Sequence, residues 1–233
     1  WKKMKKNKVA IQWELGAYSH IAVKNLYKEA EVSTCTTFEE AFKLAYNDTS
    51  IKIVIPIENS LAGRVADIHY LLPKYKLQIH GEYFQPVEHN LLCKPDAGMQ
   101  DIKYVRSHAQ AIGQCQNLIA EKKLKIIVSA DTAGSAKDLA EGNDKSIAAI
   151  ASELSAKIYN LKILKRNIED EKGNVTRFLI MGKNIEQPEF TKDNRFITSC
   201  IFRVKSEPSA LYKCLGGFAT NQVNLTKLES FSV

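Results

Sequence analysis

The hydrophobic pattern divides residues 9–181 into short apolar runs and segments with helical spacing. Runs rich in β-branched and other apolar residues predict strands or extended segments. These lie at residues 9–12, 53–57, 77–87, 88–93, 104–106, 125–129, 147–150, 163–169 and 175–181. Apolar residues that recur every three or four positions predict helices within residues 21–27, 41–45, 61–72, 111–119, 133–140 and 150–161. This alternation indicates α/β layers with at least partly parallel strands.

The segment 53–72 changes character twice, and each change marks a structural boundary. An apolar, β-branched strand is followed by three polar residues, Glu58, Asn59 and Ser60, and then by the helical spacing that starts at Leu61. Open α/β sheets bind ligands at the carboxyl ends of their strands. The polar triplet therefore predicts a site for a small polar molecule.

Further polar residues lie where a predicted strand or helix begins or ends. Ser107 follows a strand and has the capping-box spacing with Gln110, so helix capping and a role in a site are equally open. Gln114 lies outside this box, and its side chain faces either a cleft or solvent. Thr132 starts a helix, where an anion can bind. Thr176 starts a strand, where threonine is ordinarily only a good strand former.

The pattern changes again after residue 182. Residues 183–194 are polar and lack apolar periodicity, which predicts a linker. Beyond it, the sequence predicts a strand at 197–205, a helix at 208–220 and a further strand at 223–229. We therefore expect a second, smaller unit of mixed α and β structure.

Composition narrows the class of protein. The 233 residues, 45% hydrophobic and 25% charged, are typical of an ordinary globular protein with one large or two smaller units. No apolar run approaches the ~20 residues of a membrane helix. The basic start KKMKKNK is not followed by the apolar stretch of a signal peptide. We expect a cytoplasmic protein that does not bind a membrane.

Charge and cysteine usage exclude further classes. The net charge is +7, but the lysines are dispersed and form no basic stripe with aromatic residues, so nucleic-acid binding is not expected. A positive field would favour capture of a small dianion. The five cysteines are odd in number and widely spaced, which indicates reduced thiols. The five histidines show no ligand spacing, so no metal is expected.

Six segments in order resemble the motifs of the prephenate dehydratase family. They are QWELGAYSH at 12–20, PIENSLAGRVADIHYLL at 56–72, SHAQAIGQC at 107–115, DTAGSAKDLAE at 131–141, AAIASELSAKIYNLKILKRNIED at 148–170 and NVTRFLIMG at 174–182. The resemblance implies a two-lobed α/β catalytic domain at 8–184 that is similar to periplasmic binding proteins. It places lobe one at about 8–87 and 165–184 and lobe two at about 88–164.

The C-terminal segment resembles the first half of an ACT domain, a small amino-acid-sensing module. ALYKCLGGFATNQVNLTKLES at 210–230 carries this resemblance. It implies a linker at 185–194 and an incomplete ACT unit at 195–233. By the same resemblance, L-phenylalanine is the expected effector, at Ala210, Leu211, Asn224 and Leu225, and a homodimer or homotetramer is expected.

The resemblance also implies the reaction, in which prephenate loses water and carbon dioxide to give phenylpyruvate. Thr176 would donate to the leaving hydroxyl, and Asn59, Ser107 and Gln114 would complete the catalytic set. The implied substrate-binding residues are Glu58, Ser60, Thr132, Arg177 and Phe178. Arg177 either supplies charge for a substrate carboxylate or pairs with a structural acid. No cofactor is implied.

Several positions depart from the family pattern. Trp13 stands at a common glycine, Ala109 at a usual proline, Ser209 at a usual glycine, and Phe231 follows Glu229-Ser230 in place of arginine. These departures put the width of the cleft and feedback control by phenylalanine in question. An arogenate dehydratase and a non-catalytic protein that binds aromatic amino or keto acids are the alternative hypotheses.

Overall fold

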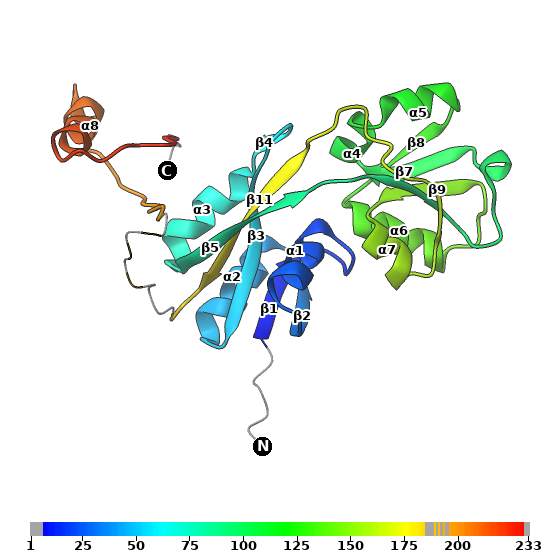
Figure 1. Cartoon of the computed structure of the whole chain (residues 1–233), viewed down its shortest axis with the longest axis horizontal. Coiled ribbons are helices and arrows are strands. Elements are labelled where there is room, and N and C mark those ends of the chain that lie inside the picture. The colour runs from blue at the N-terminus through cyan, green and yellow to red at the C-terminus, as the bar shows by residue number, and fades with distance from the viewer. Residues whose placement is uncertain (1–6, 185–188, 190, 192, 194–195, 231–233) are drawn as a thin grey trace, which may run out of the picture. The chain divides into compact units, whose positions relative to one another are not determined.

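The computed structural model describes residues 7–184, 189, 191, 193 and 196–230. The chain forms two compact units, Trp1–Gln187 and Pro188–Val233. The first unit contains two α/β lobes, each built on its own sheet, which confirms the predicted fold class (Figure 1). Most of the expected linker at 185–194 lies outside the described residues.

The first lobe is organised around a six-stranded mixed sheet with the order β2-β1-β3-β11-β5, in which β4 pairs with β3. Its strands are β1 (Asn7–Gln12), β2 (Ala30–Cys35), β3 (Ile51–Asn59), β4 (Gly63–Arg64), β5 (Gln78–Pro86) and β11 (Val175–Gly182). β1 runs parallel to β2 and β3, whereas β11 is antiparallel to both β3 and β5. The last strand of the unit thus lies between strands formed much earlier in the sequence.

Helices cover both faces of this sheet. α2 (Phe38–Asn47) and α3 (Ala66–Tyr75) bury Phe42 and Ile68 against Ile53 and Ile55 of β3. α1 (Tyr18–Leu26) covers the other face. The core beneath α1 includes Val54 of β3. Alternate residues of β3 therefore enter two separate cores, as the two-residue period of a strand requires.

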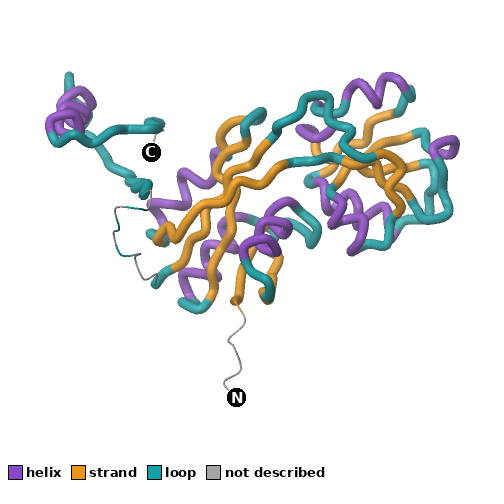
Figure 2. Tube along the Cα trace, viewed as in Figure 1, coloured by secondary structure: helices purple, strands orange, loops and turns teal. Residues whose placement is uncertain are grey.

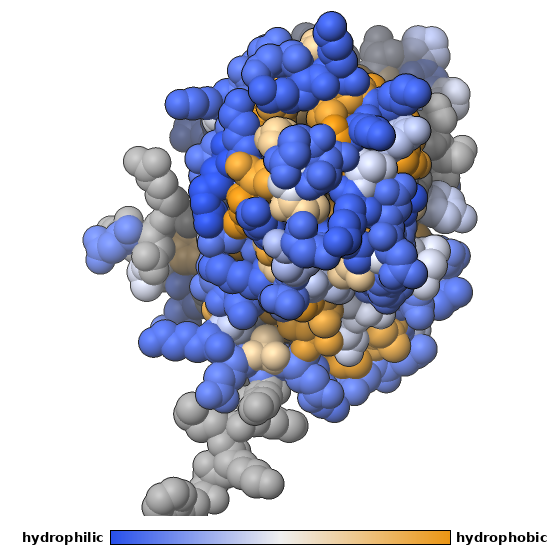
Figure 3. All heavy atoms as spheres, turned by 90° about the vertical axis from the view of Figure 1, so that its right-hand side faces the viewer, coloured by the Kyte–Doolittle hydropathy of each residue, from blue (hydrophilic) through white to orange (hydrophobic). Residues whose placement is uncertain are grey.

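The second lobe has a five-stranded mixed sheet with the order β10-β6-β9-β7-β8 (Figure 2). Its strands are β6 (Asn90–Cys93), β7 (Tyr104–His108), β8 (Lys125–Ser129), β9 (Ile147–Ala151) and β10 (Lys162–Lys165). A 3-10 turn at Met99–Asp101 and the helices α4 (Ala109–Gly113) and α5 (Gln116–Glu121) lie with one core, and α6 (Thr132–Glu141) and α7 (Glu153–Ile158) with the other. On the side of this lobe that Figure 3 shows, hydrophilic residues predominate around small apolar patches. Among the described residues, no helix has the length and apolar content to cross a membrane.

Two crossing segments connect the lobes, one between β5 and β6 and one between β10 and β11. They are hydrogen-bonded to each other, because Val87 N donates to Asn174 O at 2.8 Å and Ile168 N donates to His89 O at 2.9 Å. The two segments thus form a paired hinge.

The loop 13–17 of the first lobe packs on α7 of the second. Gly16 O accepts hydrogen bonds from Ser152 Oγ at 2.6 Å and from Ser155 Oγ at 3.1 Å. Leu15 O accepts from Tyr159 Oη at 3.0 Å. Gly16 has a φ of +96°, a conformation that favours glycine. This loop is a second connection between the lobes.

Trp13 begins this loop with a φ of +72°. A large side chain rarely adopts this left-handed conformation. Glycine, which the resemblance leads us to expect here, adopts this conformation without strain. Trp13 is 37% exposed, so it is neither a core residue nor fully in solvent.

The predicted helix at 61–72 is wrong over its first turn. β3 continues through Asn59, and the backbone N–H groups of Leu61 and Ala62 both donate to Asn59 Oδ1. Gly63, with a φ of +79°, then lets the chain turn back so that β4 pairs with β3. Apolar spacing alone does not register this side-chain-stabilised turn, so the helix begins only at Ala66.

Of the two roles left open for Ser107, helix capping is wrong. Ser107 lies within β7, and His108 is the N-cap of α4, with its Nδ1 accepting from Gln110 N at 3.3 Å. The helix predicted through 111–119 is interrupted after Gly113. Asp170, from the return crossing, accepts from Gln116 N at 2.7 Å and thereby caps a new helix.

Two further boundaries differ. Ile150 belongs to β9, and the helix predicted through 150–161 is only α7, because Ser152 caps it by accepting from Ser155 N. Within the extended segment predicted at 163–169, only Ile163, Leu164 and Lys165 belong to a strand.

The second unit contains α8 (Ala210–Thr220), which agrees with the predicted helix. The ring of Phe218 on this helix lies 5.9 Å from the ring of Phe202. The strands predicted at 197–205 and 223–229 are wrong, since the described residues there adopt no strand. A strand needs a neighbouring strand to satisfy its backbone groups, and no described segment of this unit supplies one.

Candidate active site

Asn59 lies at the end of β3, and the backbone fixes the orientation of its amide. Its Oδ1 accepts from Leu61 N at 3.0 Å and from Ala62 N at 2.9 Å. Because a backbone N–H can only donate, the NH2 group of Asn59 must face the other way. It donates to Asn174 Oδ1 at 2.7 Å and to Thr176 Oγ1 at 2.9 Å.

Thr176 begins β11 directly opposite Asn59 in the antiparallel register. Its Oγ1 accepts a hydrogen from Asn59, and its own hydroxyl hydrogen has no acceptor among the described residues. A hydroxyl that already accepts a hydrogen bond is a better donor, since hydrogen bonds in series polarise one another. The Thr176 hydroxyl therefore keeps a hydrogen that no described residue accepts.

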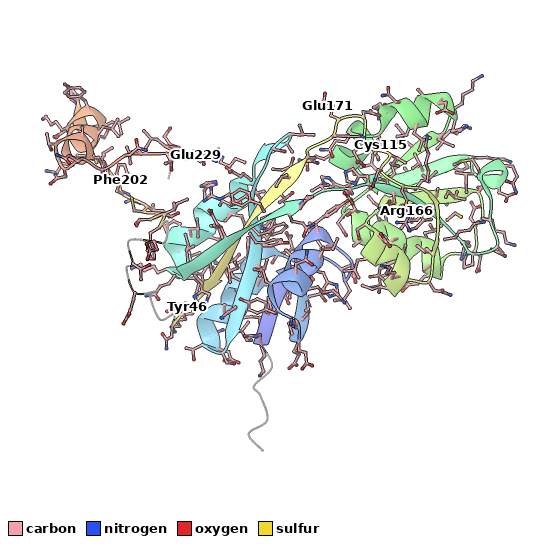
Figure 4. All side chains as sticks on the ribbon, in the orientation of Figure 1. Tyr46, Cys115, Arg166, Glu171, Phe202 and Glu229 are labelled. Atoms are coloured by element: carbon pink, nitrogen blue, oxygen red, sulfur yellow. The ribbon has the colours of Figure 1, made fainter. Side chains whose placement is uncertain are left out.

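Asn174 connects the two lobes. It lies in the return crossing, is 3% exposed, and donates from Nδ2 to Gln114 Oε1 at 2.9 Å. Gln114 ends α4 in the second lobe. Cys115, the next residue, is labelled in Figure 4 and lies at the break between α4 and α5. The crossing segment thus brings the amides of Asn59 and Gln114 to the two sides of one buried asparagine.

His89 extends the same network into the outgoing crossing. Its Nε2 lies 2.9 Å from Gln114 Oε1, and its Nδ1 lies 3.0 Å from Tyr18 Oη. Tyr18 Oη also lies 2.7 Å from Glu88 O. His89 is 3% exposed, and this burial lowers its pKa below the usual range. The imidazole is accordingly neutral at pH 7.

Sequence reasoning missed Asn174, His89 and Tyr18. Asn174 lies in what the sequence indicates only as a turn, and His89 lies in a segment with no ligand spacing. For Asn174 the available signal was a polar residue immediately before the predicted strand at 175–181, whereas His89 lies inside the predicted segment 88–93 and carried no such signal.

Ser60 and Ser107 are two other predicted site residues, and each forms a hydrogen bond with the backbone. Ser60 Oγ accepts from Val175 N at 3.0 Å and donates to Asn174 Oδ1 at 3.4 Å, so it holds the turn after β3 against β11 and joins the network at its edge. Ser107 is fully buried and donates from Oγ to Ile150 O at 2.7 Å. The structure does not bring the Ser107 hydroxyl into the network around Asn174.

Arg177 pairs with acids of its own sheet. Its Nε lies 2.8 Å from Glu82 Oε2, and its Nη1 lies 3.6 Å from Glu58 Oε1. Neighbouring residues of a strand point to opposite faces, so Arg177 and Thr176 lie on different sides of the sheet. Of the two roles considered for Arg177, pairing with a structural acid is the one that the geometry favours.

The remaining predicted residues lie apart from this network. Phe178 is 2% exposed in the core beneath α1, and Thr132 begins α6 in the second lobe. The expected effector residues belong to the second unit, Ala210 and Leu211 on α8 and Asn224 and Leu225 after it.

The site is built from neutral donors and acceptors. Its side chains are amides, a hydroxyl and an imidazole, and Arg177, next to Thr176 in β11, pairs with Glu58 and Glu82. In the part of the chain that the structure describes, no three or more His, Cys, Asp or Glu side chains are arranged to hold a metal ion. Such groups can orient an anionic molecule and donate to it without holding it by a full opposite charge.

The fold and the site together define a class of protein: a two-lobed α/β domain with a neutral polar site at its hinge. A family model described as prephenate dehydratase matches residues 9–186. The chain belongs to this family of hydro-lyases.

The relatives include more than one activity. A bifunctional N-acyl-homoserine lactone acylase/prephenate dehydratase from Komagataeibacter europaeus is 40% identical over 226 residues, covering 96% of this chain and 79% of that protein. Arogenate dehydratase/prephenate dehydratase 2 from Arabidopsis thaliana is 40% identical, and the match covers 96% of this chain but only 58% of the plant protein. The solved prephenate dehydratase of Arthrobacter aurescens in complex with L-Phe superimposes with a TM-score of 0.85 at 25% identity, covering 97% and 76% of the two chains.

Proposed function

We propose that the protein converts prephenate to phenylpyruvate, water and carbon dioxide. The observation that carries this proposal is the Thr176 hydroxyl, which accepts from Asn59 and keeps its own hydrogen for a bound molecule. Membership of the prephenate dehydratase family supplies the substrate class.

The neutral character of the site suits a reaction that releases a carboxylate. Prephenate carries two carboxylates and a ring hydroxyl, and the ring carboxylate must leave as carbon dioxide while the hydroxyl leaves as water. A full positive charge on that carboxylate would stabilise the ground state more than the transition state and slow its departure. The NH2 group of Gln114, which no described residue accepts from, orients a carboxylate with less ground-state stabilisation.

Thr176 assists the leaving hydroxyl by donating a hydrogen bond. A threonine hydroxyl is a weak acid at neutral pH, so its assigned contribution is a strong hydrogen bond to the leaving oxygen; the proton that converts the leaving hydroxide to water comes either through Thr176 or from solvent. The Asn59 amide donates to Thr176 Oγ1 and thereby makes the Thr176 hydroxyl a stronger donor. Loss of the ring carboxylate then gives the aromatic product.

The test is turnover of prephenate, followed by the ultraviolet absorbance of phenylpyruvate in alkali, for the wild type, Thr176→Ala and Thr176→Ser. Removing one such donor costs on the order of 10²–10³ in kcat. Thr176→Ser keeps the hydroxyl and is expected to retain most of the activity. Near-normal turnover by a folded Thr176→Ala protein would remove Thr176 from the mechanism.

Arogenate, the aminated relative of prephenate, is the alternative substrate of the same site, because relatives named for either activity match this chain. Parallel assays with both substrates decide the preference. Repeating the prephenate assay with L-phenylalanine tests feedback control, which is motivated by the complex of the Arthrobacter aurescens prephenate dehydratase with L-Phe. Unchanged rates at saturating phenylalanine would refute that part of the proposal.

A second candidate activity is hydrolysis of N-acyl-homoserine lactones. The specific observation is the relative from Komagataeibacter europaeus, whose name includes this acylase and which matches across 96% of this chain. Incubation with N-acyl-homoserine lactones of different acyl lengths, with detection of free homoserine lactone, tests it. Absence of release by a preparation that turns over prephenate would exclude it.

A further inference from the structure

The hydrogen bonds of the site form one chain whose direction is fixed at one end. Leu61 N and Ala62 N orient the Asn59 amide, so Asn59 donates to Asn174 Oδ1. Asn174 must then present its NH2 group to Gln114, whose Oε1 accepts. None of these three side-chain amides can flip without placing an N–H donor opposite another donor.

This direction decides the protonation of His89. Gln114 Oε1 is an acceptor because Asn174 donates to it, so a second group at 2.9 Å from the same oxygen must also donate. That group is His89 Nε2, which therefore carries a hydrogen. Burial lowers the pKa of the ring, so we infer that Nδ1 is unprotonated; Tyr18 Oη lies 3.0 Å from Nδ1 and donates its hydrogen to Glu88 O at 2.7 Å.

The protonation of His89 fixes the orientation of the Gln114 side-chain amide. Its Oε1 receives hydrogens from both His89 and Asn174, so the amide cannot flip, and its NH2 group stays available to a bound molecule. His89 lies in the outgoing crossing and Asn174 in the return crossing. Both segments of the hinge thus contribute one donor to the same glutamine.

We propose that His89 is a positioning residue, which as the neutral Nε2–H tautomer holds the Gln114 amide with its NH2 group toward the substrate. The catalytic part of this inference rests on the proposed dehydratase function. The tautomer itself follows from the hydrogen-bond geometry and is measurable without substrate.

The tautomer is read from the ¹⁵N shifts of the imidazole in ¹⁵N-labelled protein at neutral pH. We expect protonated Nε2 and unprotonated Nδ1 at His89 in the wild type. Asn174→Ala removes the donor that fixes Gln114, and the same ring is then expected to show a mixture of tautomers. A wild-type ring protonated at Nδ1, or an unchanged tautomer in Asn174→Ala, would overturn the inference.

Activity is compared between His89→Gln and His89→Leu. The glutamine amide can place an N–H donor close to the position of Nε2, whereas leucine fills the site without a donor. We expect His89→Leu to lower kcat/KM by about tenfold, the equivalent of one lost hydrogen bond, and His89→Gln to recover most of that loss. Equal activity of the two folded variants would show that His89 does not act through this donor.

The two proposals fail separately. A wild type that does not turn over prephenate but has His89 as the Nε2–H tautomer would refute the dehydratase function and leave the hydrogen-bond assignment standing. Normal turnover with the opposite tautomer would refute the positioning role alone. If His89→Leu does not fold, the ¹⁵N spectra of the wild type and Asn174→Ala still decide the assignment.

Discussion

Replacing Gly16 with alanine is expected to destabilise the protein through two separable effects. The first is local, because Gly16 has a φ of +96° and an L-residue in the left-handed region costs about 1–2 kcal/mol. The second is tertiary. A Cβ on Gly16 would lie 2.5 Å from Ser155 Oγ and 2.9 Å from Ser155 Cα, and a backbone atom cannot rotate away.

Overpacking of this kind costs about 1–3 kcal/mol, so the free energy of unfolding should fall by about 2–5 kcal/mol in total. Gly173→Ala is the matched control. Gly173 has a φ of +85°, and a Cβ there would meet nothing within 4 Å, so only the local cost applies. The difference between the two variants isolates the contact between loop 13–17 and α7.

The assay is urea unfolding at fixed pH, with the free energy obtained by linear extrapolation. Ser155→Ala in the Gly16→Ala background should recover part of the loss, because it removes the atom nearest to the new methyl group. If Gly16→Ala and Gly173→Ala lose the same free energy, the loop does not press on α7 as described. The account of this loop as a second connection between the lobes would then be wrong.

Burial supports two further predictions. Phe178→Leu should lower the free energy of unfolding by about 1–2 kcal/mol, because the Phe178 ring lies in the core. KM for prephenate should stay within twofold. A large rise in KM with unchanged stability would instead place Phe178 in the substrate-binding site. Burial lowers the pKa of His89, so the unfolded state, with a pKa of about 6.5, binds the proton first as pH falls. The free energy of unfolding of the wild type should therefore be greatest above about pH 6.5 and decline below that pH. The decline should be steeper than in His89→Gln. The lowered pKa values of His20 and His80 contribute a decline in both proteins. Parallel stability curves between pH 7.5 and 5.5 would contradict a buried, neutral His89.

Local pattern determined much of this fold. The alternation of apolar strands and helices reflects burial on one or two faces, which each segment records in its own residues. The α/β class, most strand positions and the polar triplet after the apolar run of β3 therefore follow from the sequence. So does the family, because its motifs are contiguous, and the resemblance to that family implied the two lobes.

The tertiary structure decided how these pieces combine. Thr176 accepts a hydrogen bond from Asn59 only because the antiparallel register sets it opposite Asn59, 117 residues earlier. Gln114 ends its helix because Asp170 caps the next one from the return crossing. Hydrogen bonds between residues so far apart leave no trace in local periodicity. The same reason applies to the predicted C-terminal strands, whose local residues favour extended backbone but whose formation depends on a pairing partner elsewhere.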